Sequence, residues 1–189
     1  MNAFVFPGQG SQHLGMGADL YNSNRKAQQI FEDANEILGF KITDIMFGED
    51  QEALKQTNIT QPAIYIHSMV IALIADKFFK PNAVAGHSLG EFTALAAANY
   101  ISFEDGLRLV HKRAIAMQEA CEKNESSMAA IVGLDDNTVE DVCSQSKETL
   151  VAANYNCPGQ IVISGTINAV NVACNKLTEL GARRALVLP

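Results

Sequence analysis

One serine stands in a setting that can make it a nucleophile. The segment Gly86-His87-Ser88-Leu89-Gly90 follows the apolar run 83–85 and precedes the alanine-rich stretch 91–98. A strand, the pattern G-x-S-x-G and a helix together make a nucleophile elbow, a tight turn that lifts the serine Oγ above a sheet. The glycines remove Cβ clashes in such a turn, and free N–H groups at the start of the helix can stabilise an oxyanion. The sequence therefore predicts acyl chemistry at Ser88.

A serine nucleophile needs a general base, because its hydroxyl is scarcely ionised near neutral pH. In an elbow the histidine follows the serine along the chain, and His111 is the histidine that does so here. His67 lies in a predicted buried helix and is more simply a hydrogen-bonded core residue. His87 is adjacent to Ser88 and points elsewhere, and His13 lies in the N-terminal loop. We expect none of the four histidines to be the base.

Arg113 is the second candidate for chemistry. The box Ser102–Asp105 predicts the start of a helix that runs to about residue 122. On that helix Leu109, Val110, Arg113 and Met117 fall on one arc. A charge among apolar neighbours is costly without a partner, which leaves two interpretations. The arginine snorkels at the edge of the face, which the spacing alone favours, or it is buried to hold a carboxylate in bidentate fashion.

Hydrophobic patterning predicts the elements that would position these side chains. Residues 3–6 form a strand, and residues 7–12 form a glycine-rich loop without a dinucleotide fingerprint or a Walker lysine. Residues 18–38 form a helix that ends at a glycine. Residues 58–79 form a long buried helix with Thr60 as its N-cap, Pro62 in its first turn and Gln61 at its mouth.

The pattern changes at about residue 126. The expected order is strand, helix, strand, strand, helix, strand: 127–133, 137–146, 149–154, 160–164, 167–180 and 185–188. That order is the ferredoxin-like arrangement, with Asn156–Gly159 as the hairpin connection. The fold class is therefore α/β, with a large subdomain over 1–125 that carries the elbow and an inserted small subdomain over 126–189.

Composition excludes several classes of function. The net charge is −7 and no basic run is present, which argues against nucleic-acid binding. Four widely spaced cysteines fit reduced thiols in the cytoplasm better than disulfides or a metal site. The N-terminus lacks a secretory signal pattern, and the longest apolar run, 69–75, is too short to span a bilayer. We expect a cytoplasmic protein without membrane contact, and a monomer is favoured.

The end of the sequence predicts a further feature. Residues 185–189 are an apolar strand with no polar tail, and too few strands precede residue 126 for a self-sufficient sheet. The expectation is that these residues are one piece of a longer protein.

Five motifs in order carry a family resemblance. They are Phe6-Pro7-Gly8-Gln9-Gly10-Ser11-Gln12, Thr60-Gln61-Pro62-Ala63, Gly86-His87-Ser88-Leu89-Gly90-Glu91, Arg113 with Met117-Gln118, and Gly159-Gln160-Ile161-Val162-Ile163-Ser164-Gly165. The set resembles the malonyl-CoA:acyl carrier protein transacylases, the acyltransferase family of fatty acid and polyketide synthesis. The resemblance spans the whole chain. It implies an α/β-hydrolase-like large subdomain that carries a ferredoxin-like small one.

The resemblance also implies roles for individual residues. Ser88 would attack the malonyl thioester and become a malonyl ester, with the N–H groups of Leu89 and Gln9 as the oxyanion hole. Arg113 would hold the free carboxylate of malonate, with His87 and Gln61 also at the substrate-binding site. Coenzyme A would leave and the phosphopantetheine thiol of acyl carrier protein would take the acyl group. The resemblance implies no cofactor and no metal.

One part of the family pattern has no counterpart here. The family's catalytic histidine lies beyond the last strand of the small subdomain, and this sequence ends before it, so low activity is expected of these residues alone. Two alternatives remain open: a serine esterase or thioesterase that uses the same elbow, and a non-catalytic interaction module. Arg113 and the Gln9 loop argue against the esterase.

Overall fold

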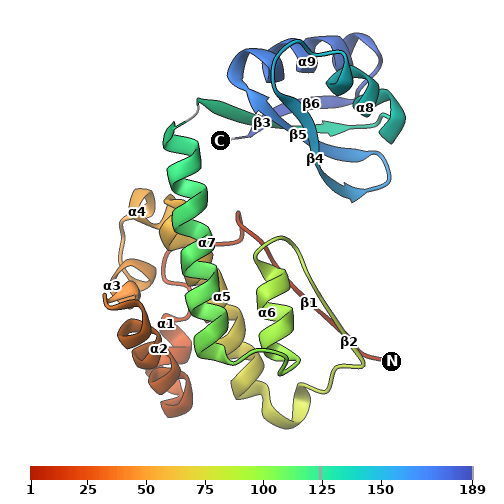
Figure 1. Cartoon of the computed structure of the whole chain (residues 1–189). Helices are drawn as coiled ribbons and strands as arrows, with labels where there is room; N and C mark the ends of the chain where they lie inside the picture. The colour runs from red at the N-terminus through yellow and green to blue at the C-terminus, as the bar shows by residue number, and fades with distance from the viewer. Residues whose placement is uncertain (124, 189) are drawn as a thin grey trace. The chain divides into compact units, whose positions relative to one another are not determined.

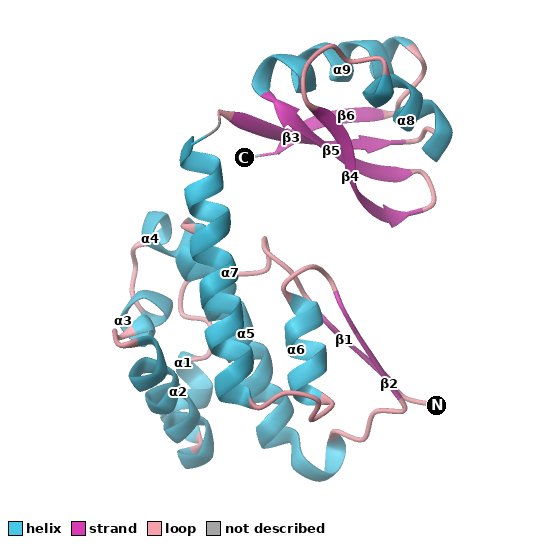
Figure 2. Ribbon diagram, viewed as in Figure 1, coloured by secondary structure: helices cyan, strands magenta, loops and turns pink. Residues whose placement is uncertain are grey.

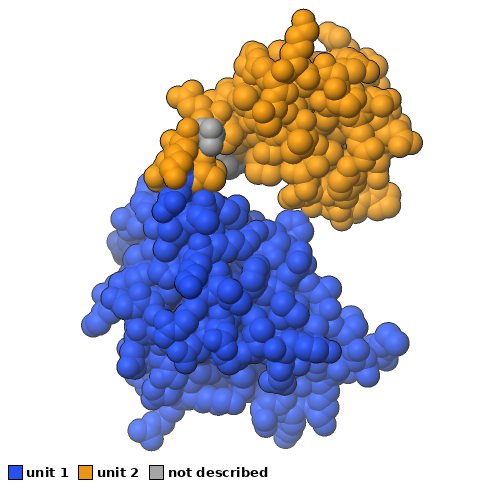
Figure 3. All heavy atoms as spheres, in the orientation of Figure 1, with its two compact units in different colours: residues 1–119 blue, residues 120–189 orange. Residues whose placement is uncertain are grey.

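The computed structural model describes residues 1–123 and 125–188 and divides into two units. The first unit is Met1–Glu119 and the second is Ala120–Pro189, and Figure 3 colours them separately. The division falls inside one long helix, α7 (Phe103–Lys123). Each unit has its own hydrophobic core.

The first unit is mainly helical (Figure 1). Its elements before α7 are β1 (Ala3–Phe6), α1 (Ala18–Ser23), α2 (Arg25–Leu38), α3 (Ile42–Phe47), α4 (Gln51–Lys55), α5 (Thr57–Ala75), η1 (Asp76–Phe78), β2 (Ala83–Gly86) and α6 (Gly90–Ala97). The strands β1 and β2 pair in parallel, from Ala3 opposite Ala83 to Phe6 opposite Gly86. The predicted strands at 3–6 and 83–85 are confirmed, and the helices between them make the crossover that parallel pairing requires.

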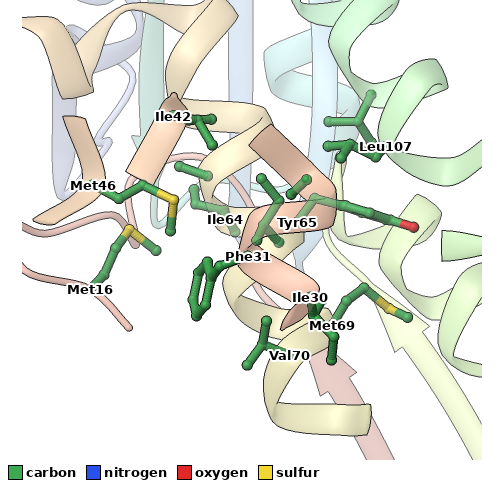
Figure 4. Packing of buried hydrophobic residues seen from close by; sticks show 14 of the residues in the cluster. Met16, Ile30, Phe31, Ile42, Met46, Ile64, Tyr65, Met69, Val70 and Leu107 are labelled. Carbon is green, nitrogen blue, oxygen red and sulfur yellow. The ribbon is translucent and has the colours of Figure 1, made fainter. Parts of the chain in front are cut away.

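Helix α5 forms the centre of this unit's core. Its Ile64, Tyr65 and Met69 are almost wholly buried, and they pack with Phe31 of α2 and Leu107 of α7 (Figure 4). Most of its residues between Ile59 and Val70 are buried, which explains why its apolar positions run around the helix rather than along one face.

The segment Thr57–Phe78 is also long and apolar enough to cross a membrane by length and composition, with a mean hydropathy of 1.3. Of the 18 residues within it that have this hydropathy, 61% are buried inside the protein, and the core helix of a soluble protein meets the same criteria of length and composition. This segment is longer than the apolar run 69–75 on which the expectation of no membrane span rested.

Two predicted helix boundaries are wrong. The helix expected over 18–38 is broken at Asn24, whose extended backbone ends α1 and whose Oδ1 accepts from the N–H groups of Lys26 and Ala27 to begin α2. The helix does end at Gly39, in the left-handed conformation that favours glycine. The cap bonds of Asn24 therefore favour two separate helices over one continuous helix at this position.

Thr60 is not an N-cap. Helix α5 already begins at Thr57 after Gln56, because the carbonyl of Gln56 accepts from the N–H groups of Ile59 and Thr60. The Thr60 hydroxyl instead donates to the carbonyl of Leu54 at 2.5 Å, which ties α5 to the end of α4. Pro62 consequently lies inside the helix rather than in its first turn.

The second unit follows the predicted order of elements. They are β3 (Ser126–Val132), α8 (Asp136–Ser144), β4 (Leu150–Cys157), β5 (Gln160–Thr166), α9 (Ile167–Glu179) and β6 (Arg184–Leu188). The strands pair antiparallel in the order β4-β5-β3-β6. Figure 2 shows α8 and α9 together on one face of this sheet. The hairpin between β4 and β5 is tighter than predicted, since Asn156 and Cys157 belong to β4 and the turn is Pro158-Gly159.

Candidate active site

The serine lies at a strained turn between β2 and α6. Ser88 has a φ of 55°, in the left-handed region that a residue with a Cβ rarely adopts. The strand ends at Gly86 and helix α6 begins at Gly90, so the turn holds only His87, Ser88 and Leu89. This is the strand-turn-helix geometry of a nucleophile elbow, and strain of this kind is typical of functional sites.

Both glycines of the G-x-S-x-G pattern are required by close backbone contacts. A Cβ on Gly86 would lie 1.9 Å from the carbonyl carbon of Gly90 and 2.2 Å from the nitrogen of Glu91. A Cβ on Gly90 would lie 2.4 Å from the carbonyl oxygen of Phe6, at the end of the neighbouring strand. The first backbone contact closes the turn on itself, and the second presses it against β1.

The predicted N-terminal loop packs against the same turn. A Cβ on Gly8 would lie 2.6 Å from Nδ1 of His87 and 2.7 Å from the His87 carbonyl oxygen. His87 therefore lies against the loop that holds Gln9, and its backbone N–H continues the β1–β2 ladder by donating to Phe6. Leu89 is fully buried at the start of α6.

Arg113 reaches the serine from helix α7. Its Nη2 donates to Ser88 Oγ at 2.8 Å, and its Nη1 donates to Gln61 Oε1 at 2.5 Å. The guanidinium is half-buried, and this desolvation lowers its pKa from the ordinary value, while the charge of Glu91 acts in the opposite direction. The arginine therefore has polar partners at the site rather than the apolar surroundings that its position on the helix suggested.

The predicted arc of α7 is only partly buried. Val110 is fully buried, whereas Leu109 is 46% exposed and Met117 is 39% exposed. The buried side of the helix runs through Leu107, Val110 and Ala114. Arg113 lies at the margin of that side, which is why its charged end can reach Ser88.

Gln61 joins the arginine to the N-terminal loop. It is 1% exposed, and its Nε2 lies 3.4 Å from Gln9 Oε1 and 3.3 Å from Met117 Sδ. The Nε2 of Gln9 in turn lies 3.5 Å from Thr57 Oγ1. The structure thus brings together Ser88, Arg113, Gln61 and Gln9. Sequence reasoning did not assign Thr57 or Met117 to the site, although Met117 belongs to one of the five motifs.

The other histidines lie in different surroundings. The rings of His13 and His67 face each other edge to face at 6.4 Å, and burial lowers the pKa of His67, with His13 adding to the effect. The ring of His111 lies 6.0 Å from that of Phe40, and burial lowers its pKa also.

In the part of the chain that the structure describes, no group of three or more histidine, cysteine or acidic side chains could hold a metal ion. All four cysteines are free thiols, with Cys143 and Cys174 buried and Cys121 and Cys157 exposed.

Comparison with known proteins identifies the family that this fold and serine site represent. Residues 3–188 match the model of the acyl transferase domain, so the chain belongs to that family. Among curated proteins, it is 42% identical to the malonyl CoA-acyl carrier protein transacylase of Staphylococcus aureus (strain MRSA252), over 98% of this chain and 61% of that protein. The chain therefore spans about three-fifths of the length of this relative.

Solved structures agree with this assignment. The malonyl CoA-acyl carrier protein transacylase of Coxiella burnetii superposes with a TM-score of 0.93 at 39% identity, over 99% of this chain and 60% of that one. A malonyl-transacylase solved in complex with a type II polyketide synthase acyl-carrier protein gives a TM-score of 0.91 at 38% identity, over 98% of this chain and 62% of that one.

Proposed function

We propose that the protein containing this chain transfers a malonyl group from malonyl-CoA to the phosphopantetheine thiol of acyl carrier protein, in fatty acid biosynthesis. The observation that carries the proposal is the hydrogen bond from Arg113 Nη2 to Ser88 Oγ at 2.8 Å. This bond supports the presence of a cation within reach of an acyl group on the serine. Such a cation suits an acyl chain that carries a free carboxylate. The names of the relatives point to the same reaction.

The reaction takes two displacements. Ser88 Oγ attacks the thioester carbonyl carbon of malonyl-CoA and forms the ester C–O bond as the C–S bond breaks, and the serine proton ends on the sulfur of the departing coenzyme A. The thiol of acyl carrier protein then attacks the ester carbonyl carbon, a new C–S bond forms as the C–O bond to Ser88 Oγ breaks, and the thiol proton ends on Oγ. We assign the N–H groups of Leu89 and Gln9 to the oxyanion of each tetrahedral intermediate. None of the chain's four histidines is assigned as the base.

Arg113 would change partners during this cycle. A guanidinium can bind a carboxylate through two parallel N–H···O bonds, and it stays charged at neutral pH. In the free site one of its donors is used on Ser88 Oγ. The malonyl carboxylate would replace that weaker, neutral acceptor, with Gln61 holding the other side of the fork and His87 bordering the site.

The fold and partners proposed are those of the family. We assign the α/β-hydrolase-like large subdomain to residues 1–125 and the ferredoxin-like small subdomain to residues 126–189. The strand-helix-strand-strand-helix-strand order of the second unit supports the latter. Acyl carrier protein is the proposed macromolecular partner, as in the complex of the related transacylase. We propose a cytoplasmic monomer that needs no cofactor.

The test mixes the protein, in the form that its gene encodes, with labelled malonyl-CoA and acyl carrier protein, and it follows the label. Label should appear on acyl carrier protein, and mass spectrometry should find a malonyl ester on Ser88. The Ser88→Ala variant should give neither product. Free malonate without labelled acyl carrier protein would instead indicate a hydrolase.

Arg113→Ala separates the carboxylate clamp from general damage to the site. It should lower malonyl transfer and spare or raise acetyl transfer, because an acetyl group has no carboxylate to bind. Equal loss with both acyl groups would contradict the assigned role of Arg113.

A further inference from the structure

The side-chain amide of Gln61 is oriented by partners on both of its ends. Its oxygen accepts from Arg113 Nη1 at 2.5 Å. Its nitrogen faces Met117 Sδ at 3.3 Å and Gln9 Oε1 at 3.4 Å. A guanidinium can only donate, whereas a thioether sulfur and an amide oxygen only accept. A flipped Gln61 amide would place donor against donor and acceptor against acceptor.

Burial makes this orientation costly to lose. Gln61 is 1% exposed, so water has little access to replace a missing partner of its amide. Gln9, by contrast, is exposed on the N-terminal loop, and its own amide contact to Thr57 is long at 3.5 Å. Met117 is also partly exposed, at 39%, but it lies on a helix and not on a loop.

Met117 shares a helix with the arginine, so the backbones of the two residues are held together. Met117 lies four residues after Arg113 on α7, one turn along the same side of the helix. The helix backbone therefore fixes the separation of the two Cα atoms, and Gln61 bridges the sulfur and the guanidinium with opposite ends of one amide. Rotation of the arginine away from this position would break its bond to a group that the sulfur holds in place.

We propose that Met117 is a positioning residue that acts through Gln61 to hold the Arg113 guanidinium at Ser88. The sulfur sets which end of the Gln61 amide faces the arginine, and the amide oxygen fixes Nη1. Nη2 is then directed at the serine oxygen and, in the acyl-enzyme, at the carboxylate of the acyl chain. The kinetic consequence rests on the proposed malonyl transfer, whereas the structural one does not.

Met117→Leu tests the sulfur while keeping apolar bulk at the position. The KM for malonyl-CoA should rise by roughly three- to tenfold with little change in kcat, the scale of one lost hydrogen bond that acts in both ground and transition states. Acetyl transfer should not change. Met117→Gln, which restores an acceptor oxygen, should recover part of the loss, and it keeps the test available if the leucine variant does not fold.

A double-mutant cycle distinguishes positioning from simple contact with substrate. In a Gln61→Ala background, Met117→Leu should have no further effect on KM, because its route to Arg113 is already absent. An equal effect in both backgrounds would mean that Met117 acts without Gln61 and would overturn the proposal. Met69→Leu, the same exchange in the core of α5, is the matched control and should leave KM unchanged.

A measurement without any acyl group keeps this inference separate from the proposed function. In NMR spectra of this chain, the Arg113 side-chain N–H signals should be sharp and slowly exchanging, and Met117→Leu should broaden them. Broadening in a protein that transfers no malonyl group would refute the proposed function and leave the positioning role intact. Unchanged signals in both Met117 variants would refute the positioning role even if malonyl transfer is observed.

Discussion

Arg113 and Ser88 are joined by a hydrogen bond of 2.8 Å although they lie 25 positions apart in the chain. One is on helix α7 and the other at the turn between β2 and α6. The bond places a full positive charge next to the oxygen of a candidate nucleophile. A change in the position of the arginine should therefore change the reactivity of the serine, which can be measured.

Arg113→Lys should therefore impair the site although it preserves charge. A lysine ammonium is a single point and cannot bond to Gln61 Oε1 and Ser88 Oγ in the planar fork geometry of arginine. We expect malonyl transfer to fall at least ~10-fold, the scale of one charge-assisted hydrogen bond. Steady-state kinetics of the two acyl donors measure this. Arg108→Lys, on the same helix in an exposed pair with Glu104, should leave the rate unchanged.

Gly86→Ala should destabilise the elbow severely. Its Cβ would come within 2.2 Å of three backbone atoms of Gly90 and Glu91, and backbone atoms cannot move aside as a flexible side chain can. We expect a loss of at least about 3 kcal/mol in the free energy of unfolding, as for other mutations that overpack a rigid site. Urea denaturation followed by circular dichroism measures it.

Gly181→Ala is the matched control for that variant. Gly181 has a φ of 101° with nothing within 4 Å of the added Cβ, so only backbone strain opposes the methyl group. Its cost should be about 1 kcal/mol. Similar costs at the two positions would show that the close contacts at Gly86 relax.

Asn24→Ala should cost about 1 kcal/mol of stability, the usual value for an N-cap asparagine. The Asn24 Oδ1 accepts from two backbone N–H groups at 2.9 and 3.1 Å, and alanine supplies no acceptor. Gln56→Ala should be close to neutral, because the side chain at the start of α5 makes no cap bond. Equal effects of the two changes on the unfolding midpoint would contradict the capping role of Asn24.

Stability should fall as the pH is lowered from 7 to 5. Burial holds the pKa values of His67 and His111 below 6.5 in the folded protein, so the unfolded chain binds more protons in the window below that value. The contribution of these neutral histidines is complete above pH 6.5 and is lost as the pH falls toward their folded pKa values. Urea midpoints across this range measure the slope, which His67→Gln with His111→Gln should flatten. An unchanged slope in the double variant would assign the pH dependence to other groups.

The sequence was sufficient for the strands and for the elbow because both depend on local patterns, whereas the short helices α3 and α4 were not predicted. Short segments of strand-like composition predicted each strand of the second unit, and glycines at fixed spacing marked the turn at Ser88. The break at Asn24 was missed because the periodicity continues across it. Only the cap bonds to Lys26 and Ala27 distinguish two helices from one.

The site itself could be predicted only in part. The residue types of Ser88 and Arg113 signalled chemistry, yet their hydrogen bond depends on how α7 packs beside the elbow, which no local pattern encodes. The same applies to Thr57 and Met117. A threonine near a helix start and a methionine on a helix arc are common, and only tertiary packing gives them amide partners.

The chain of contacts from Thr57 to Ser88 has a consequence for the order of folding. Its bonds link residues 25 to 56 positions apart, so each closes a long loop, whereas the helices form from neighbours. Long-range closure is the slow part of folding in small domains. A refolding chain should regain its helical signal first, and reactivity of Ser88 toward a serine-directed probe should return only in the last phase.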